Sequence, residues 1–430
     1  MHLILAILAF NIIVIVHELG HFLAARAVGI RVMEFSLFLG PKLFSIMRGG
    51  TTYSLRLFPI LAYVKLEGDD EASDSESSFS KKSKSARAFT MIAGPLANLL
   101  LAVILLTGYF AFGGYETTRI ARIAENSPAA AAGMQKGDRI VSYGGKRTHI
   151  PLDVIQFLYV SKGEPVTVEF ERDGKLLRGE LKPIYHPEAS TPMIGVTLDL
   201  TNPEGSNVLK EVSPGSPAEN AGLMAGDRIV AINGAEVDSY DKLSGLLKEN
   251  GIKELEIQAL RNGALVSAVL TPIEAKTDEW YEVGLEFAYV RGNIPDSFIQ
   301  SGVFIYSIVR SVFYSPTWLI TGRANISDMM GPIGMVSAIT TTVSQAPDIG
   351  RMLMYLMYIT GMLSVAIGAT NLLPFPALDG GRLLLIGIEA VRGKPLSQEK
   401  ESIISMAGFV IIILLAIYIA YNDILKLVVR

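Results

Sequence analysis

The stretch IVIVHELGHF, residues 13–22, decides the class of this protein. It places His17, Glu18 and His21 inside the apolar segment 3–25, and about 20 such residues suffice for a membrane-spanning helix. Positions four apart lie on one face of a helix, so the two histidines lie side by side. Ionisable groups within a span cost several kcal/mol unless they are paired or coordinated. The stretch therefore predicts a functional site within the membrane.

The composition supports a membrane protein. Half of the 430 residues are hydrophobic, 19% are charged, and the mean hydropathy is +0.37. Such an apolar chain is typical of a membrane protein with soluble parts. A net charge of −4 gives no electrostatic reason to expect nucleic acid as a partner. The chain has no cysteine, so thiolate catalysis, cysteine zinc sites and disulfides are excluded, and any transition metal must be held by His and carboxylates.

Four segments are predicted to span the membrane, residues 3–25, 89–112, 352–373 and 402–422. A fifth apolar segment, 297–320, carries polar residues near helical spacing and is interrupted by Pro316. We expect it to form an amphipathic helix at the membrane surface. The first segment lacks a positively charged start and exceeds a signal-peptide core in length, which favours a span over a signal peptide.

Charges in the loops predict the orientation. The loop 26–88 is rich in Lys and Arg and is expected to be cytoplasmic. The first span then runs inward, and residues 113–296 lie outside. With the helix 297–320 at the surface, the carboxyl end of the third span lies on the same side as that of the first.

The outer region contains a repeat. The stretches beginning at Glu125 and Pro214 match at an offset of 89 residues, and IGVTL at Ile194 matches VGLEF at Val283 at the same offset. Short helices with Ser caps, Gly turns and apolar strands make the pattern resemble PDZ domains of bacterial proteases. We expect two such domains, 113–203 and 204–292. Binding of an extended peptide at a sheet edge and simple spacing or screening both remain open as their role.

A zinc ion at His17 and His21 needs a third protein ligand and an open position for water, with Glu18 placed to handle the proton of that water. The chain has three other histidines, and two of them, His149 and His186, fall in the outer domains. A carboxylate is then expected. Asp379, in the Pro- and Gly-broken stretch NLLPFPALDGGR (371–382), lies at the matching end of the third span. The alternative for this aspartate is an ordinary turn or helix cap.

The combination of HELGH, NLLPFPALDGG and paired PDZ-like domains resembles the site-2 protease family of intramembrane zinc metalloproteases, and within it the bacterial branch that regulates sigma-E. The resemblance implies a Zn²⁺ cofactor held by His17, His21 and Asp379, with Glu18 as catalytic base and acid. Asn371, Pro374 and Pro376 match the Asn-Pro-Pro motif of the family, with Asn371 implied in holding substrate backbone.

Three further stretches are family-like. Residues 40–68 match the membrane-associated β-hairpin region, where Tyr63 and Val64 are implied in substrate contact and Gly49-Gly50 is expected at the turn. Leu61-Ala62 stands where the family often has Gly-Gly. The other two stretches are MIAGPLANLL (91–100) and DMMGPIGM (328–335). The polar segment 69–85 is expected to be a flexible cytoplasmic linker.

The expected architecture is a polytopic α-helical membrane protein with four spans, two β-rich PDZ-like domains and a membrane-associated β-hairpin region. Its parts are 1–112 (two spans with the hairpin loop), 113–203 and 204–292 (the PDZ-like domains), 293–350 (surface helix and linker) and 351–430 (two spans).

The resemblance implies a zinc-dependent intramembrane endopeptidase that cuts single-pass membrane proteins first trimmed by an upstream site-1-type protease. The implied substrates are an anti-sigma factor in an envelope stress response and remnant signal peptides, with the PDZ-like domains filtering them. The implied location is the bacterial inner membrane, with the PDZ-like domains periplasmic and the active site toward the cytoplasm. The alternatives are a non-enzymatic PDZ membrane scaffold, which would not need a zinc site, and a metal transporter, which would need a series of ligands across the bilayer.

Overall fold

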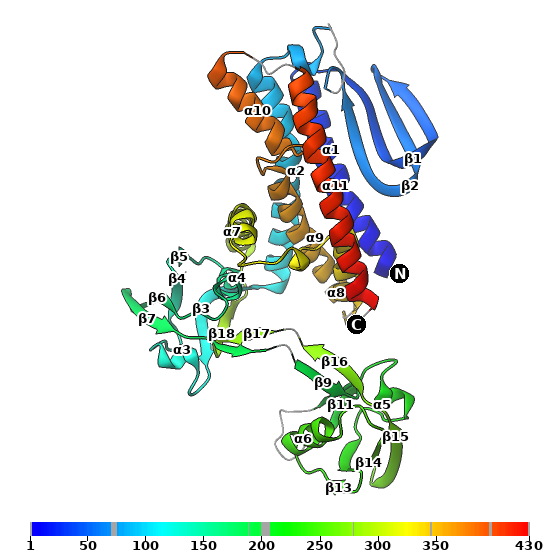
Figure 1. Cartoon of the computed structure of the whole chain (residues 1–430), viewed down its shortest axis with the longest axis vertical. Helices are drawn as coiled ribbons and strands as arrows, with labels where there is room; N and C mark the ends of the chain where they lie inside the picture. Colours follow the sequence, from blue (N-terminus) through cyan, green and yellow to red (C-terminus); the bar gives the residue numbers. More distant parts are fainter. Residues whose placement is uncertain are drawn as a thin grey trace. The chain divides into compact units, whose positions relative to one another are not determined.

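Figure 1 presents the computed structural model of the chain, which describes residues 2–69, 75–187, 189–198, 207–277, 279–344, 346–394 and 398–428. Part of the expected linker, residues 70–74, lies outside the described residues. In the described part, five helices are long and apolar enough to cross a membrane. They are α1 (His2–Ala27), α2 (Lys84–Gly113), α7 (Ile294–Ile320), α9 (Ile349–Asn371) and α11 (Gln398–Val428). Helices α1, α2 and α11 contain predicted spans, α9 covers the predicted span 352–373 except for its last two residues, and α7 is the additional helix.

Helix α7 is amphipathic, as expected. One face carries a row of serines that are at most 6% exposed: Ser297, Ser301, Ser307 and Ser311. Large apolar side chains elsewhere on the helix are 55–86% exposed: Phe298, Ile299, Tyr306 and Ile320. Figure 1 shows α7 nearly along its own axis, while α1, α2 and α11 run lengthwise, so α7 crosses the direction of the bundle. A crossing helix with one exposed apolar face suits the membrane surface. Four spans with α7 at the surface therefore stay our prediction.

Helix α2 is central in the bundle and packs against α1, α7, α9 and α10 (Asp379–Arg392). Glycines permit the close approaches. A Cβ at Gly20 of α1 would lie 2.3 Å from the carbonyl oxygen of Ala93, and a Cβ at Gly368 of α9 would lie 3.0 Å from that of Pro95. Small residues at interfaces are the usual means of tight helix packing in membranes. This packing brings α1, α2 and α9 together at the depth of HELGH.

The predicted hairpin consists of β1 (Val32–Arg48) and β2 (Thr51–Leu66), joined by Gly49-Gly50 with φ of 61° and 80°, as predicted. The strands are bent, and residues 34–37 pair with 52–55 on one side and with 62–65 on the other. The hairpin therefore forms a small sheet in which 62–66 is an edge segment. Exposed apolar side chains on its far part include Leu43, Phe44, Ile46 and Met47, which suits contact with a membrane.

The outer region forms two β-rich units with the same internal contacts. In the first, Arg172 binds the buried Asp138 and the carbonyl of Gly133. In the second, Arg261 binds Asp227 and the carbonyl of Gly222 in the same way. Each pair of equivalent residues is 89 positions apart, the offset of the match seen in the sequence.

The first unit has the sheet β18-β3-β4-β6-β7 with β5 beside β4, together with α3 and α4. Its elements are β3 (Tyr115–Ile123), α3 (Pro128–Ala131), β4 (Arg139–Tyr143), β5 (Lys146–Arg147), α4 (Pro151–Ser161), β6 (Val166–Arg172), β7 (Lys175–Leu181) and β18 (Leu285–Val290). The second unit has the sheet β13-β12-β14-β15 and the pair β10-β11. Its elements are β10 (Val196–Leu198), β11 (Leu209–Val212), α5 (Pro217–Asn220), β12 (Arg228–Ile232), β13 (Ala235–Glu236), α6 (Tyr240–Asn250), β14 (Leu255–Arg261) and β15 (Ala264–Leu270).

The chain connectivity of these units differs from the expected tandem, 113–203 followed by 204–292. Strand β18 pairs with β3 of the first unit, and β10 pairs with β11 of the second. Two short antiparallel pairs, β8-β17 and β9-β16, join the units, with β8 (Ile184–His186), β9 (Ala189–Met193), β16 (Ile273–Thr277) and β17 (Trp280–Glu282). The second unit, Ile184–Glu282, is therefore inserted in the first. The repeat shows which residues are equivalent, but the pairing between strands that are distant in the chain depends on the tertiary structure.

The stretch DMMGPIGM leads into α8 (Pro332–Ser344), after the short turn η3 (Ile326–Asp328). The buried carboxylate of Asp423 in α11 accepts hydrogen bonds from the backbone N–H groups of Gly331 and Gly334, at 3.2 and 2.8 Å. A Cβ at either glycine would lie within 3 Å of that carboxylate. The two glycines therefore allow α11 to dock on the start of α8.

Candidate metal centre

The HELGH stretch lies within α1 and places its histidines on one buried face. His17 and His21 are 9% and 8% exposed, and their Nε2 atoms lie 3.2 Å apart. Two ring nitrogens at this distance repel each other unless a proton or a cation lies between them. The pair has the spacing that two imidazole ligands of one metal need.

Asp379 completes the group. Its Oδ2 lies 3.2 Å from Nε2 of His17 and 3.3 Å from Nε2 of His21. Ligand atoms of these three residues all lie within 4.8 Å of one another. The buried Oδ2 has no hydrogen-bond donor. Two imidazoles and a carboxylate with a free oxygen form a donor set that suits Zn²⁺.

Residues of α2 orient the two rings, and the sequence analysis did not identify them. Nδ1 of His21 lies 2.8 Å from the carbonyl oxygen of Thr90, which requires a proton on Nδ1 and leaves Nε2 free to bind a metal. The amide of Asn98 lies 3.4 Å from Nδ1 of His17. A Cβ at Gly94 would lie 2.3 Å from Nε2 of His21. The family-like stretch 91–100 was the signal, but it did not show which side chains meet the rings.

The turn before α10 presents Asp379, the first residue of that helix. Gly380 and Gly381 lie so close to the preceding turn that a Cβ on either would approach a carbonyl oxygen within 2.3 Å. Ala377, two residues before the aspartate, has φ of 72°, a left-handed conformation that is costly for a residue with a side chain. The turn is thus folded back tightly on itself, which fixes the aspartate at the end of α9.

A polar cavity of about 260 Å³ contains the three candidate ligands. Glu18 also lines it, and the backbone of Val64 is within hydrogen-bonding reach of the Glu18 carboxylate. The other lining residues are Leu66, Asp69, Met91, Asn371, Ala377 and Arg382. The cavity therefore lies between α1, the edge segment 62–66 of the small sheet and the turn at the start of α10. A peptide bond held there would lie among a proton acceptor and three metal ligands.

The structure brings two of the five expected substrate-binding residues to this cavity, Asn371 and Val64. The Tyr63 hydroxyl accepts a hydrogen bond of 2.7 Å from Arg56. Pro376 packs against α11, where a Cβ placed on Gly408 would lie 2.4 Å from the Cβ of Pro376. Pro374 lines a different, apolar groove. Away from the cavity, the His149 ring contacts Tyr306 and the His186 ring stacks on Trp280.

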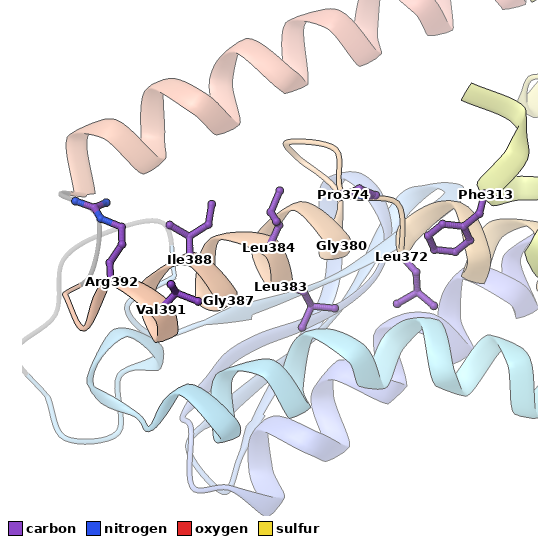
Figure 2. Close-up of a pocket in the computed structure, with 10 residues that line it drawn as sticks. All are labelled: Phe313, Leu372, Pro374, Gly380, Leu383, Leu384, Gly387, Ile388, Val391 and Arg392. Atoms are coloured by element: carbon purple, nitrogen blue, oxygen red, sulfur yellow. The ribbon is translucent and has the colours of Figure 1, made fainter. Parts of the chain in front are cut away.

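The apolar groove, of about 740 Å³, runs along α10. Figure 2 shows Leu384, Ile388 and Val391 along this helix, with Leu372 and Phe313 near one end of the groove and Arg392 near the other. The groove thus begins at the turn that carries Asp379.

Comparisons with known proteins found a matching family and several similar proteins. The pattern of the family described as "Peptidase family M50" matches residues 5–415. A "Zinc metalloprotease RasP" of Geobacillus kaustophilus is 30% identical over 434 residues, 98% of this chain and 97% of the relative. A "Regulator of sigma E protease" of Haemophilus influenzae is 30% identical over 457 residues, 98% of each. The "Regulator of sigma-E protease RseP" of Escherichia coli is 28% identical over 450 residues, 98% of each.

Proposed function

The chain belongs to peptidase family M50 and is a metalloendopeptidase of the site-2 protease type, and from this premise we propose that it cuts transmembrane segments of other membrane proteins. The observation that carries the proposal is the convergence of His17, His21 and Asp379 with Glu18 in one polar cavity of a helical bundle. Its apolar helices and its sigma-E-type relatives make it a multi-pass protein of the inner membrane.

The roles of the site residues follow from their positions. Zn²⁺ held by His17, His21 and Asp379 would supply Lewis-acid activation of water and of the peptide carbonyl. Glu18 would accept the proton of the attacking water and return it to the leaving amine. Asn371, at the rim of the same cavity, would donate a hydrogen bond to substrate backbone. Water would enter through the polar end of the cavity, near Asp69 and Arg382.

The edge segment 62–66 suggests how a substrate is held. Its outer side faces the cavity at Val64, and among the described residues no strand pairs with that side. A substrate helix that unwinds locally could add a strand there, which would satisfy its backbone hydrogen-bonding groups and expose one peptide bond to Glu18. Proline substitutions in 62–66 that left cleavage unchanged would contradict this part of the proposal.

The two β-rich units would select substrates. We infer that they are PDZ-like domains on the periplasmic side, with the metal centre toward the cytoplasm. They would exclude bulky proteins or sense an end produced by an upstream site-1-type protease. We propose anti-sigma factors and remnant signal peptides as the substrate classes, and the names of the sigma-E-type relatives support the first of these. A tagged substrate with an intact or a shortened outer part would test the selection, because deletion of Ile184–Glu282 should allow cleavage of the longer form.

One experiment tests the enzymatic proposal against the two alternatives. Purified full-length protein is mixed with a single-span membrane protein whose outer part has been shortened. We expect the wild type to cut it, and Glu18→Gln to keep zinc and lose cleavage, because the amide cannot accept the proton. A scaffold would cut nothing in either form. A transporter would carry zinc across vesicles, and its transport would not depend on a substrate protein.

A further inference from the structure

Two charged residues at the polar end of the metal cavity have no part in the roles described above. Asp69 and Arg382 both line the cavity and form an ion pair with each other. Asp69 is 16% exposed and Arg382 is 35% exposed. The pair therefore lies at the mouth of the site, where it is partly shielded from water.

The positions of these residues in the chain matter. Asp69 follows Leu66, the last residue of the edge segment, by three residues. Arg382 follows Asp379 by three residues in α10, so it lies one helical turn along and on the same face. The ion pair thus connects the segment on which a substrate strand would be added with the turn that carries the candidate metal ligand.

The loop after the edge segment is also tied to the residue that precedes β1. The N–H of Glu67 donates to the carbonyl of Arg31, and the N–H of Phe79 donates to the carbonyl of Glu67, at 3.0 and 2.7 Å. These bonds hold the end of the segment against the start of the hairpin. They do not set its distance from the start of α10, which the pair at the mouth of the cavity can set.

We propose that Asp69 and Arg382 form a clamp that holds the edge segment 62–66 and the Asp379 turn at the separation that an added substrate strand needs. They are positioning residues for peptide cleavage, and this inference rests on the proposed function. A partly exposed ion pair contributes little to stability, so the fold does not depend on it. A misplacement of about 1 Å at a reacting centre can lower a rate about 100-fold, so cleavage can depend on it.

The clamp predicts a specific pattern of kinetics. With purified full-length protein and the shortened single-span substrate, Asp69→Asn and Arg382→Gln should each lower kcat about threefold to thirtyfold, with KM changed less than about twofold. Zinc content should stay that of the wild type, since neither residue is a candidate ligand. Mass spectrometry of the products should show cuts at neighbouring bonds as well as at the wild-type bond, because the strand is held less firmly.

Two further variants separate a clamp from two independent effects. The double variant Asp69→Asn/Arg382→Gln should lose no more kcat than either single variant, since both changes break the same contact. Arg382→Lys keeps the ion pair and should retain most of the activity. The control is Arg139→Gln, which breaks a comparable pair with Glu171 on the first β-rich unit and should leave kcat and the cut site unchanged.

Three results would overturn the clamp: single variants with wild-type kcat and a single cut site, losses that multiply in the double variant, or a loss of zinc in Arg382→Gln. The failure of the proposed function would look different. In that case the wild type and Glu18→Gln would cut equally, or neither would cut. Cleavage that requires Glu18 but ignores both clamp variants would refute the clamp alone.

Discussion

The carboxylate of Asp379 lies 3.2 Å from the ring nitrogen of His17, although one residue belongs to the first helix and the other begins α10. Helix α2 makes this meeting possible, because it packs against both elements and supplies the groups that orient the histidine rings. The site is therefore a property of the bundle, while each of its sequence motifs supplies one side of it.

Removal of the aspartate should release the metal. Asp379→Asn replaces a charged ligand by a neutral amide, and we expect zinc affinity to fall by more than about 100-fold, since loss of an outer hydrogen bond alone costs about 10- to 100-fold. Zinc content after dialysis against a chelator measures this. Glu18→Gln is the matched control, because it changes a neighbouring carboxylate and should retain zinc. Equal zinc in both variants would contradict the assigned ligand set.

Gly94 should be essential for the geometry of His21. Gly94→Ala places a Cβ 2.3 Å from Nε2 of that ring, so the ring or the helix must move. We expect zinc affinity to fall about tenfold or more, and activity with it. Gly302→Ala is the control, since a Cβ at this glycine of α7 would meet no atom within 4 Å. A Gly94→Ala protein with normal zinc and activity would show that the two helices lie farther apart.

Leu61 should be a strained position. Its φ of 66° is left-handed, a conformation that is costly for a residue with a side chain. Leu61→Gly should stabilise the small sheet by about 0.5–1 kcal/mol, because glycine adopts this conformation without a steric cost. Slower hydrogen exchange of the β1 and β2 amides would measure the gain. Leu57→Gly, at a position of the same strand without positive φ, should instead speed that exchange.

The buried carboxylate of Asp227 should make the second β-rich unit sensitive to acid. A hydrogen bond from Arg261 lowers the pKa of Asp227 below its ordinary value of 3.8, aided by the N–H of Met224, although burial opposes the shift. A carboxyl with a lowered pKa stabilises the fold at pH values above 3.8, and this contribution is lost as the pH falls through the pKa of the folded unit.

Asp227→Asn should therefore destabilise this unit by about 1–3 kcal/mol at neutral pH and weaken its dependence on pH in acid. Hydrogen exchange of β12 and β14 in the full-length protein provides the measurement. Asp238→Asn, which breaks an exposed pair with Lys242, should have a much smaller effect. Similar effects of the two substitutions would contradict the importance of burial at Asp227.

Asp423 should hold α11 against α8. Asp423→Ala leaves the N–H groups of Gly331 and Gly334 without their acceptor, at an expected cost of about 1–3 kcal/mol. Amides in the first turn of α8 should then exchange faster. Asp423→Asn keeps one acceptor oxygen and should lie between the wild type and the alanine variant. Unchanged exchange in Asp423→Ala would show that α8 is fixed by other contacts.

The sequence by itself determined the local chemistry. The spacing of His17 and His21 follows from the helical period, the long apolar helices follow from apolar length, and Gly49-Gly50 determines the turn of the small sheet. The 89-residue repeat identified which outer residues are equivalent. These features are visible in the linear sequence, so they can be recognised without knowledge of the fold.

The tertiary structure decided what no local pattern contains. It set the distance of Asp379, already predicted from the sequence, to the histidines. It also selected Thr90 and Asn98 as the groups that orient their rings, and it made β18 a strand of the first β-rich unit, so that the second unit is inserted in it. It also paired Asp69 with Arg382. Each of these is a contact between residues far apart in the chain, and such contacts depend on how helices and strands pack, because the sequence around either partner does not specify the other.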